Sequence, residues 1–236
     1  MSATIGIDKC LTFIHNQMQS PATDTRAGAR DTGKLAITIS RQTGTGGLAI
    51  AQTLATYLQK HGPRRDKPWT VFDKNLVEEV LKQHNLPKNL AVYMSEERTS
   101  ELQDMVEEVL GMHPSSWVLV RRVTETILSL AELGNVILVG RGANFVTCRL
   151  DHVFHVRIVG TLERRIERLR EFERVSEKAA RKLIEEGDEA RRRYLRKHFK
   201  KDIDDPLHYD LVLNTDRISD ESAMHLIAEA ALARCG

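Results

Sequence analysis

The sequence predicts an α/β domain in which a parallel sheet of five strands carries helices on both faces. The first observation behind this prediction is that short, continuous apolar runs alternate with stretches of helical spacing, a pattern typical of strands buried on both sides. The second is a glycine-rich turn directly after the first run. The third is that charged residues follow the second and third runs, where parallel sheets bind their ligands.

The strands are predicted from apolar runs that are rich in β-branched residues. They cover Leu35–Ile39, Trp69–Phe72, Val136–Val139, Val153–Val159 and Tyr209–Leu213. Apolar residues at helical spacing predict the helices between them. These helices begin after Gly47, at Leu76, at Leu102, at Val120, at Leu162 behind an N-terminal cap at Thr161, at Ser176 and at Ser219.

The length of 236 residues suits one α/β domain with a small appendage, or two small domains at most. Residues Ile7 to Gln17 have mixed helical spacing, and Ser20 to Lys34 are rich in Ala, Thr, Gly, Asp and Arg. We therefore expect an N-terminal helix and a flexible linker over residues 1–34, and a folded domain over residues 35–236.

The charge of the chain is uneven. The net charge is +2, but the segment Thr161–Lys201 holds 15 Lys and Arg against 9 Asp and Glu. A local basic surface on a nearly neutral protein suits a small anion better than a long polyanion. Aromatic residues make up 5% of the chain and form no interleaved set for stacking on bases. Nucleic acid is therefore not an expected partner, and the oligomeric state stays open.

Cysteine usage and hydropathy indicate a cytoplasmic protein. Cys10, Cys148 and Cys235 lie far apart and, like the histidines, show no metal-ligand spacing. This argues against a disulfide framework and against a metal site made by the protein, and it fits a reducing compartment. No apolar run approaches the roughly 18 residues of a membrane helix, and the N-terminus does not read as a secretory signal.

The turn Ser40–Gly47 is a candidate phosphate cradle between a strand and a helix. Its glycines let backbone amides approach a ligand, and the helix start adds unpaired donors and partial positive charge. The candidate donor-phosphate residues of the turn are Arg41, Thr43, Gly44, Thr45, Gly46 and Gly47. The alternative is a turn that only links strand to helix.

The turn departs from the standard phosphate-binding loop G-x-x-x-x-G-K-[ST]. Arg41 stands at the first glycine position, Gly47 at the lysine position and Leu48 at the hydroxyl that binds Mg²⁺. The cradle is kept, while its cation and its metal ligand are missing from their usual places. Thr43 or Thr45 could offer a hydroxyl, and Arg41 could offer charge.

Two charged residues at strand ends are further candidates. Asp73 ends the second strand, where it would either cap a helix or hold Mg²⁺ through water and orient an acceptor. Arg141 lies between two glycines after the third strand. We favour a phosphate contact there over a surface turn, because the glycines leave the backbone open and the guanidinium can bind phosphate with two hydrogen bonds.

Arginines on later helices are the remaining candidates. Arg165 and Arg168 are three residues apart, and Asp188 is followed by Arg191 and Arg192 on the next helix. Most of these charges fit solvated helices with internal ion pairs, but phosphoryl transfer needs several cations that a mobile flap can supply. Arg98 could contact an acceptor phosphate, but the sequence favours a solvated helix start there.

The chain resembles the cytidylate kinase-like family of the P-loop nucleoside monophosphate kinase superfamily. The resemblance covers roughly Leu35 to the C-terminus. It is carried by Ile39-Ser-Arg-Gln-Thr-Gly-Thr-Gly-Gly47, Phe72-Asp-Lys-Asn-Leu76, Val139-Gly-Arg-Gly-Ala143, Arg165, Asp188-x-x-Arg191-x-x-Tyr194 and Tyr209-Asp-Leu-Val-Leu-Asn-Thr215.

The resemblance implies a three-layer α/β/α P-loop NTPase fold, a helical monophosphate-binding insert at about 74–133 and an arginine-rich lid at about 172–205. It implies ATP and Mg²⁺ as cofactors and nucleotides as substrates. By position, Asp73, Arg141 and Arg191 would be catalytic. Arg165 and Arg168 would join the turn in binding the donor, and Asp73, Arg98 and Arg141 would bind the acceptor.

The expected function is phosphoryl transfer from ATP to a nucleoside monophosphate, CMP-like, or to a similar small phosphate acceptor. Cytidylate kinases proper carry Lys, Thr and Asp where this chain has Gly47, Ala49 and Gly142. These losses favour the alternative of a nucleotide-binding regulatory or sensor protein with little or no catalysis. The retained Asp73, Arg141, Arg165 and Arg191 favour the enzyme, and a non-nucleotide metabolite as acceptor also stays open.

Overall fold

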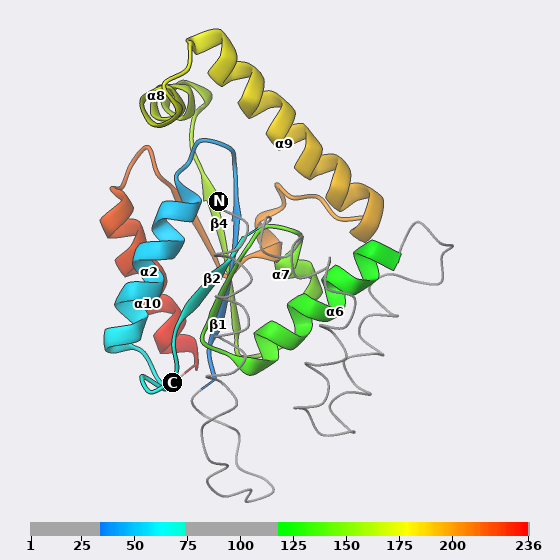
Figure 1. Cartoon of the computed structure of the whole chain (residues 1–236), viewed down its shortest axis with the longest axis vertical. Coiled ribbons are helices and arrows are strands. Elements are labelled where there is room, and N and C mark those ends of the chain that lie inside the picture. Colours follow the sequence, from blue (N-terminus) through cyan, green and yellow to red (C-terminus); the bar gives the residue numbers. More distant parts are fainter. Residues whose placement is uncertain (1–33, 74–117, 236) are drawn as a thin grey trace, which may run out of the picture.

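The computed structural model describes residues 34–73 and 118–235 (Figure 1). The predicted N-terminal helix and linker, the predicted helices that begin at Leu76 and Leu102, and Arg98 lie outside the described residues, apart from Lys34 at the end of the linker.

A single parallel sheet of five strands forms the centre of the described structure. The strands are β1 (Ala36–Arg41), β2 (Thr70–Phe72), β3 (Val136–Val139), β4 (Val153–Val159) and β5 (Leu211–Asn214). Their order across the sheet is β2-β3-β1-β4-β5, and each pair of neighbours is parallel. The predicted α/β class with a five-stranded parallel sheet is therefore confirmed. All carboxyl ends meet at one edge, with the end of the central β1 in the middle.

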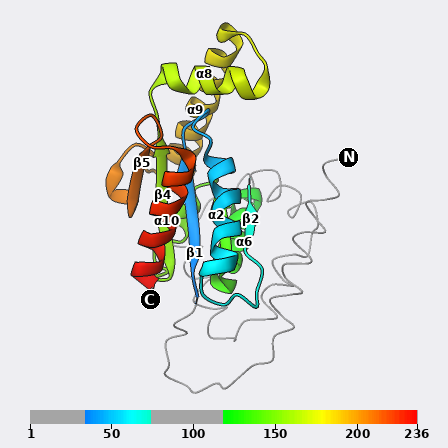
Figure 2. The same ribbon diagram turned by 90° about the vertical axis from the view of Figure 1, so that its left-hand side faces the viewer.

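Helices cover both faces of the sheet. On one face α2 (Gly47–His61) and α10 (Asp220–Cys235) lie side by side (Figures 1 and 2). Their buried aliphatic residues share a core with alternate residues of the strands, among them Ile37 and Ile39 of β1. On the other face α6 (Val118–Leu133) and α7 (Ala143–Val146) cover a second core that includes Phe72 and Leu138. Burying apolar surface on both faces is what holds such a parallel sheet together.

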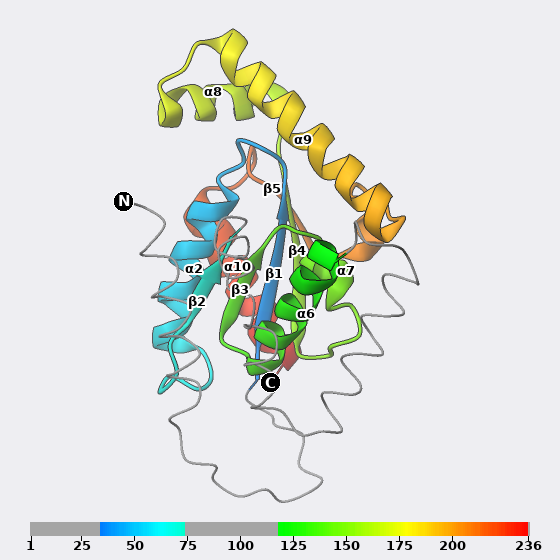
Figure 3. The ribbon, with the colours of Figure 1, turned by 45° about the vertical axis from the view of Figure 1, so that its right-hand side comes forward.

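A pair of charged helices crosses the carboxyl edge of the sheet. These are α8 (Leu162–Glu173) and α9 (Glu177–Phe199), drawn in yellow-green to gold in Figures 1 and 3. The Ser176 hydroxyl caps α9 by accepting a hydrogen bond from the Ala179 amide. The two helices share only a small apolar core of Ile166, Ala180 and Ile184. At its far end α9 is fixed to the body of the domain by Leu195 and Phe199, which pack into the core beneath α6 and α7.

Most predicted elements are confirmed, with small shifts. The strand over Val153–Val159 and the helix start at Leu162 agree with the prediction, whereas β5 begins two residues later than the predicted start at Tyr209. The short helix α7 was not predicted, because four residues give too little periodicity to recognise. Within the described residues, no helix is both long and apolar enough to span a membrane.

Candidate phosphate-binding site

The glycine-rich turn has a backbone conformation that favours glycine and amides that are available for an anion. Gly44 and Gly46 have φ angles of +85° and +75°, a region that costs other residues strain. Among the described residues, no protein group accepts a hydrogen bond from the amides of residues 44–49. The last three of these amides form the first turn of α2, so the helix adds partial positive charge at the same place.

One amide of the turn is already occupied by a carboxylate. Oδ1 of Asp188, from α9, accepts hydrogen bonds from the Thr43 amide at 2.8 Å and from the Thr43 hydroxyl at 2.9 Å. The approach is close because Gly187 has no side chain: a Cβ there would lie 2.6 Å from Thr43 Oγ1. An internal anion therefore sits at the entrance of the cradle and ties the charged helix pair to the turn.

Two predicted arginines converge on the same carboxylate. Nη1 of Arg165 donates to Asp188 Oδ2 at 2.6 Å and to the Thr43 carbonyl at 3.2 Å. Nη1 of Arg191 donates to Asp188 Oδ1 at 3.0 Å and to Thr43 Oγ1 at 2.5 Å. Burial on its own would raise the pKa of Asp188, but the hydrogen bonds from Thr43 and Arg165 outweigh burial and lower this pKa. Asp188 is therefore held as a charged carboxylate.

Arg168 lies directly against the turn from α8. A Cβ on Gly46 would fall 1.9 Å from Nη2 of Arg168, so the guanidinium fills the space that any side chain at position 46 would need. Asp220, at the start of α10, holds this guanidinium through hydrogen bonds to Nη1 and Nη2, and the pair raises the pKa of Arg168. Gly44 is also pressed by α8, with a Cβ position 2.7 Å from the Arg165 carbonyl.

A cavity of about 290 Å³ opens beside the turn, between the end of β1, the Gly140–Asn144 segment and α9. Arg41, Arg141 and Arg191 line it together with Tyr194, whose ring lies 5.9 Å from the guanidinium carbon of Arg141. The cavity thus adjoins the turn and is bordered by three of the predicted phosphate-binding arginines.

The arginines around the cavity repel one another. The pKa of Arg41 is lowered to about 10, first by burial and then by the charges of Arg191, Arg141 and Arg157, while Asp73 opposes the shift. Burial also lowers the pKa of Arg191, against the effect of Asp188. A site in which buried cations outnumber the carboxylates that oppose them favours an incoming anion, because the anion removes the repulsion.

A second charged cluster supports the wall of the cavity. The buried Arg157 of β4 donates to Ser40 Oγ at 2.9 Å and to Asp204 Oδ1 at 2.8 Å. The Tyr209 hydroxyl donates to the Ile203 carbonyl at 2.8 Å. Sequence reasoning did not single out Arg157 or Asp204, since an arginine inside a strand and an aspartate in a loop carry no recognisable motif.

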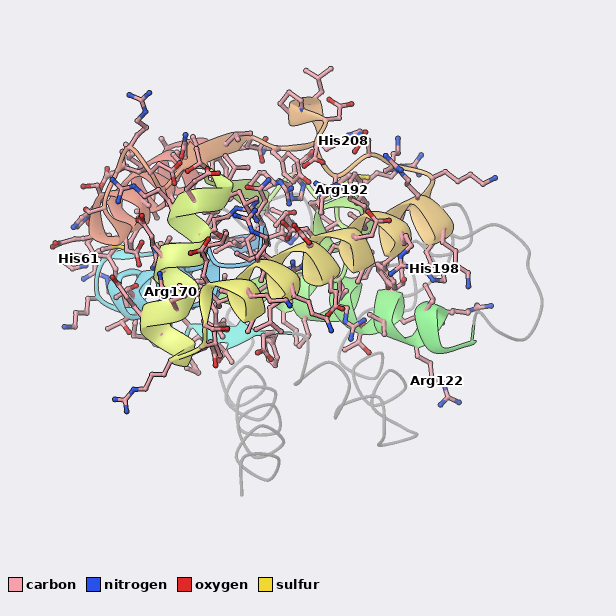
Figure 4. All side chains as sticks on the ribbon, turned by 90° about the horizontal axis from the view of Figure 1, so that it is seen from above. His61, Arg122, Arg170, Arg192, His198 and His208 are labelled. Carbon is pink, nitrogen blue, oxygen red and sulfur yellow. The ribbon has the colours of Figure 1, made fainter. Side chains whose placement is uncertain are left out.

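The structure brings most of the predicted site residues together. The turn residues, Arg165, Arg168 and Arg191 meet at the cradle, Arg141 lies across the cavity, and Asp73 directly follows β2. The Thr45 hydroxyl donates to the Gln42 carbonyl and is buried, so Thr45 can offer a ligand only its amide. In Figure 4, which looks down on α8 and α9, Arg170 lies on the exposed side of α8, whereas Arg192 lies beside the loop after α9, where its Nε donates to Asp204 Oδ2 at 3.2 Å.

Comparison with known proteins agrees with this architecture. Residues 36–217 match the model of the cytidylate kinase-like family. A cytidylate kinase of Methanopyrus kandleri is 28% identical over 169 residues, which cover 68% of this chain and 86% of that protein.

Two solved structures are similar. One is an uncharacterised protein of Eubacterium ventriosum, with a TM-score of 0.64 and 20% identity over 84% of this chain and 98% of the other. A shikimate kinase of Bacteroides thetaiotaomicron aligns over 83% of this chain and 96% of its own, with a TM-score of 0.42 and 15% identity. The family match spans all five strands and the charged helix pair, and on this ground the chain belongs to the cytidylate kinase-like family.

Proposed function

We propose that this protein transfers the terminal phosphoryl group of ATP to a nucleoside monophosphate, CMP-like, or to a similar small phosphate acceptor. One observation carries the proposal: a cavity lined by mutually repelling arginines lies at the carboxyl edge of the sheet, next to the turn whose backbone amides have no acceptor among the described residues. Amides alone would suit any anion, whereas several converging cations suit a reaction in which charge spreads over a phosphoryl group.

The donor side of the site is the turn with α8. The amides of residues 44–49 are placed to hold the donor phosphates, and Arg168 covers them from above Gly46. When bound there, ATP supplies the phosphoryl group, whose bond to the ADP oxygen breaks as a bond to an acceptor phosphate oxygen forms. The residues present fit this group, since donors are plentiful at the turn and the cation of Arg168 lies above Gly46.

Mg²⁺ would be held by fewer protein groups than in standard members of the superfamily. The metal-binding hydroxyl is absent, and the Thr43 hydroxyl is engaged by Asp188 and Arg191. Asp73 remains, close enough to Arg41 to oppose the lowering of its pKa. Mg²⁺ commonly uses one or two carboxylates, phosphate oxygens and water, so Asp73 suffices as the protein ligand and would act through water.

The acceptor side is the cavity. At about 290 Å³ its described part is near the lower end of the range for small-molecule sites, roughly 300–1,000 Å³, which suits a compact phosphate ester. Arg141 would bind the acceptor phosphate from the far wall. The buried side chain of Asn144 lies in the cavity wall beside the Tyr209 hydroxyl, where its amide Nδ2 would also donate to an acceptor oxygen.

Arg191 lies between the two sides. It borders the cavity and contacts Thr43 of the turn, so its guanidinium is placed to bind the phosphoryl group during transfer, where added charge stabilisation counts most. The α8–α9 pair would exclude water from this region when closed, which limits loss of the phosphoryl group to hydrolysis.

One observation favours the second candidate, a nucleotide-binding protein with little catalysis. The Thr43 amide, at the mouth of the cradle, is taken by Asp188, and the usual lysine and hydroxyl are absent. Such a protein would bind nucleotide and change the position of α8 and α9 without transferring phosphate.

The deciding experiment is turnover with ATP and Mg²⁺ across a panel of nucleoside monophosphates, alongside thermal unfolding with and without ATP. We expect ATP with Mg²⁺ to raise the melting temperature, and at least one monophosphate to be converted to its diphosphate. Absence of a thermal shift at millimolar ATP would remove the binding site from consideration. A shift without turnover on any acceptor, including non-nucleotide phosphate esters, would favour the sensor.

A further inference from the structure

We infer that the guanidinium of Arg41 takes the place of the lysine that standard phosphate-binding loops carry at the position of Gly47. The cation would thus enter the cradle from the first position of the loop instead of the seventh. This inference rests on the proposed function and deepens it, because it names the group that replaces a missing part of the donor site.

Gly47 is not required by its own backbone. Gly44 and Gly46 have positive φ angles, but Gly47 does not, and it is the first residue of the α-helix α2. A lysine could adopt this backbone conformation without strain. The reason for a glycine at position 47 must therefore lie in its surroundings.

The surroundings of Gly47 are the side chain of Arg41. A Cβ added to Gly47 would lie 3.0 Å from both Cβ and Cγ of Arg41, closer than carbon atoms pack without repulsion. The stem of Arg41 therefore occupies the space into which a side chain at position 47 would start. The arginine at the first loop position and the glycine at the seventh therefore go together, because the glycine leaves room for the arginine side chain that replaces the lysine.

A second glycine accommodates the far end of Arg41. A Cβ on Gly140 would lie 2.3 Å from Nη1 of Arg41, so the guanidinium rests against the backbone of the segment that ends β3. From there it borders the cavity along with Arg141 and Arg191. The side chain thus runs from the α2 end of the turn to the junction of donor and acceptor sides, where a loop lysine is needed to contact the phosphates.

The electrostatics of Arg41 support the same role. Its pKa falls to about 10 through burial and three neighbouring arginines, yet it stays protonated at neutral pH. Burying one more cation among cations is unfavourable without an anion. A bound triphosphate would supply that anion and would gain more from Arg41 than from an exposed cation.

Arg168 is a less suitable substitute for the lysine. It already makes two hydrogen bonds to Asp220, it is about one-third exposed, and it covers Gly46 from α8 instead of entering from beneath the turn. Arg168 would therefore cover the bound donor from α8, while Arg41 is itself a residue of the turn.

The exchange can be tested by reversing it. The variants are Arg41→Gly, Gly47→Lys, the double variant Arg41→Gly with Gly47→Lys, and the matched double variant Arg41→Gly with Gly47→Ala. Each is measured for ATP affinity by calorimetry with Mg²⁺, for turnover with the best acceptor, and for melting temperature. Calorimetry reports on the donor site even where turnover is absent.

We expect Arg41→Gly to lower turnover by about 10²–10³-fold, as removal of one preorganised cation or donor does, and to weaken ATP binding. Gly47→Lys alone should also be impaired, because Arg41 blocks its path. The Arg41→Gly and Gly47→Lys pair should recover at least about tenfold over Arg41→Gly, which is about 1.4 kcal/mol. The Arg41→Gly and Gly47→Ala pair, which relieves the crowding without restoring charge, should recover nothing.

If the two double variants both folded and had equal ATP affinity and equal turnover, the inference would be overturned while the proposed function stayed in place. If the wild-type protein neither bound ATP nor turned over any acceptor, the proposed function would fail and the inference with it. If the wild type bound ATP without turnover, the same comparison of the two double variants by ATP affinity would still decide on Arg41.

Discussion

The carboxylate of Asp188 accepts a 2.8 Å hydrogen bond from the backbone amide of Thr43, across 145 residues of sequence. The same carboxylate is bound by Arg165 and Arg191. These are donors of the kind that a phosphate at the turn would use, since amides and guanidinium groups bind phosphate in proteins. In the described structure Asp188 thus plays the part of an internal anion, and it ties the α8–α9 pair to the cradle.

Replacing Asp188 by Asn tests directly whether its carboxylate holds the α8–α9 pair at the turn. The change leaves the buried Arg165 without its carboxylate, and breaking a buried pair in this way typically costs about 3–5 kcal/mol. We expect the free energy of unfolding to fall by an amount of this order in urea titrations, and ATP to restore more stability in the variant than in the wild type. Glu189→Gln, an exposed neighbour on α9, should change stability by less than about 0.5 kcal/mol. An unaltered unfolding curve for Asp188→Asn would show that Asp188 does not hold the α8–α9 pair at the turn.

Arg191→Ala should reduce kcat on the order of 10²–10³-fold with little change in melting temperature. The reason is that Arg191 connects the cavity to Thr43 of the turn, so its charge would act mainly on the phosphoryl group in transit. Steady-state kinetics with both substrates varied is the measurement. Arg193→Ala on the same helix is the control, since its side chain is 73% exposed. Equal kcat values for the two variants would remove Arg191 from the transfer step.

Asn144→Leu should separate stability from acceptor affinity. Leucine is close to asparagine in size and removes the polar contact of Asn144 with the Tyr209 hydroxyl, so the melting temperature should change by no more than a few degrees. The KM for the acceptor should rise roughly tenfold because a hydrogen bond to it is lost, while the KM for ATP should not move. Thr147→Val, which alters a buried hydroxyl of the same segment bonded to the Ala143 carbonyl, should leave both KM values unchanged. A higher KM for ATP alone would contradict the placement of the acceptor.

Stability should fall as the pH drops below about 6.5, and His155 should be one cause. Burial lowers the pKa of His155 to about 4, against the opposing effect of Asp210, and its Nδ1 is hydrogen-bonded to the Thr38 hydroxyl at 2.8 Å. Because the folded pKa lies below the unfolded value, the unfolded chain binds more protons between about pH 6.5 and 4. The stabilising contribution is thus complete above pH 6.5 and is lost toward pH 4, by up to about 3 kcal/mol.

Urea unfolding of wild type and His155→Gln at pH 7.5 and pH 5 measures this contribution. The variant should lose less stability than the wild type over this interval. His61→Gln is the matched control, because His61 lies on the exposed end of α2 (Figure 4), and it should keep the pH dependence of the wild type. A parallel pH dependence of His155→Gln and wild type would exclude His155 as the cause.

The elements that the sequence predicted well are those that local patterns specify. A seven-residue run with five apolar positions defined β4, and Ser176 before a charged, periodic stretch defined the start of α9. Gly44 and Gly46 indicated a turn that needs positive φ angles, and both have them. In each case the information lies within a few neighbouring residues.

The partners of the charged residues were not predictable in the same way. The spacing of Asp188 and Arg191 suggested only an intrahelical pair, and that pair exists at 3.0 Å. That Asp188 also takes the Thr43 amide depends on where α9 crosses the sheet. Likewise, Asp220 holds Arg168 only because α8 and the start of α10 both reach the turn.

The sequence by itself determined a parallel sheet with a glycine-rich turn after its first strand, because continuous apolar runs and glycines act through backbone geometry and burial that each segment carries with it. Only the tertiary structure decided which cations serve that turn. Arg41 lies against Gly47 and Gly140, and Asp188 lies against Thr43, since side-chain charge acts over a few ångströms of space and not along the chain.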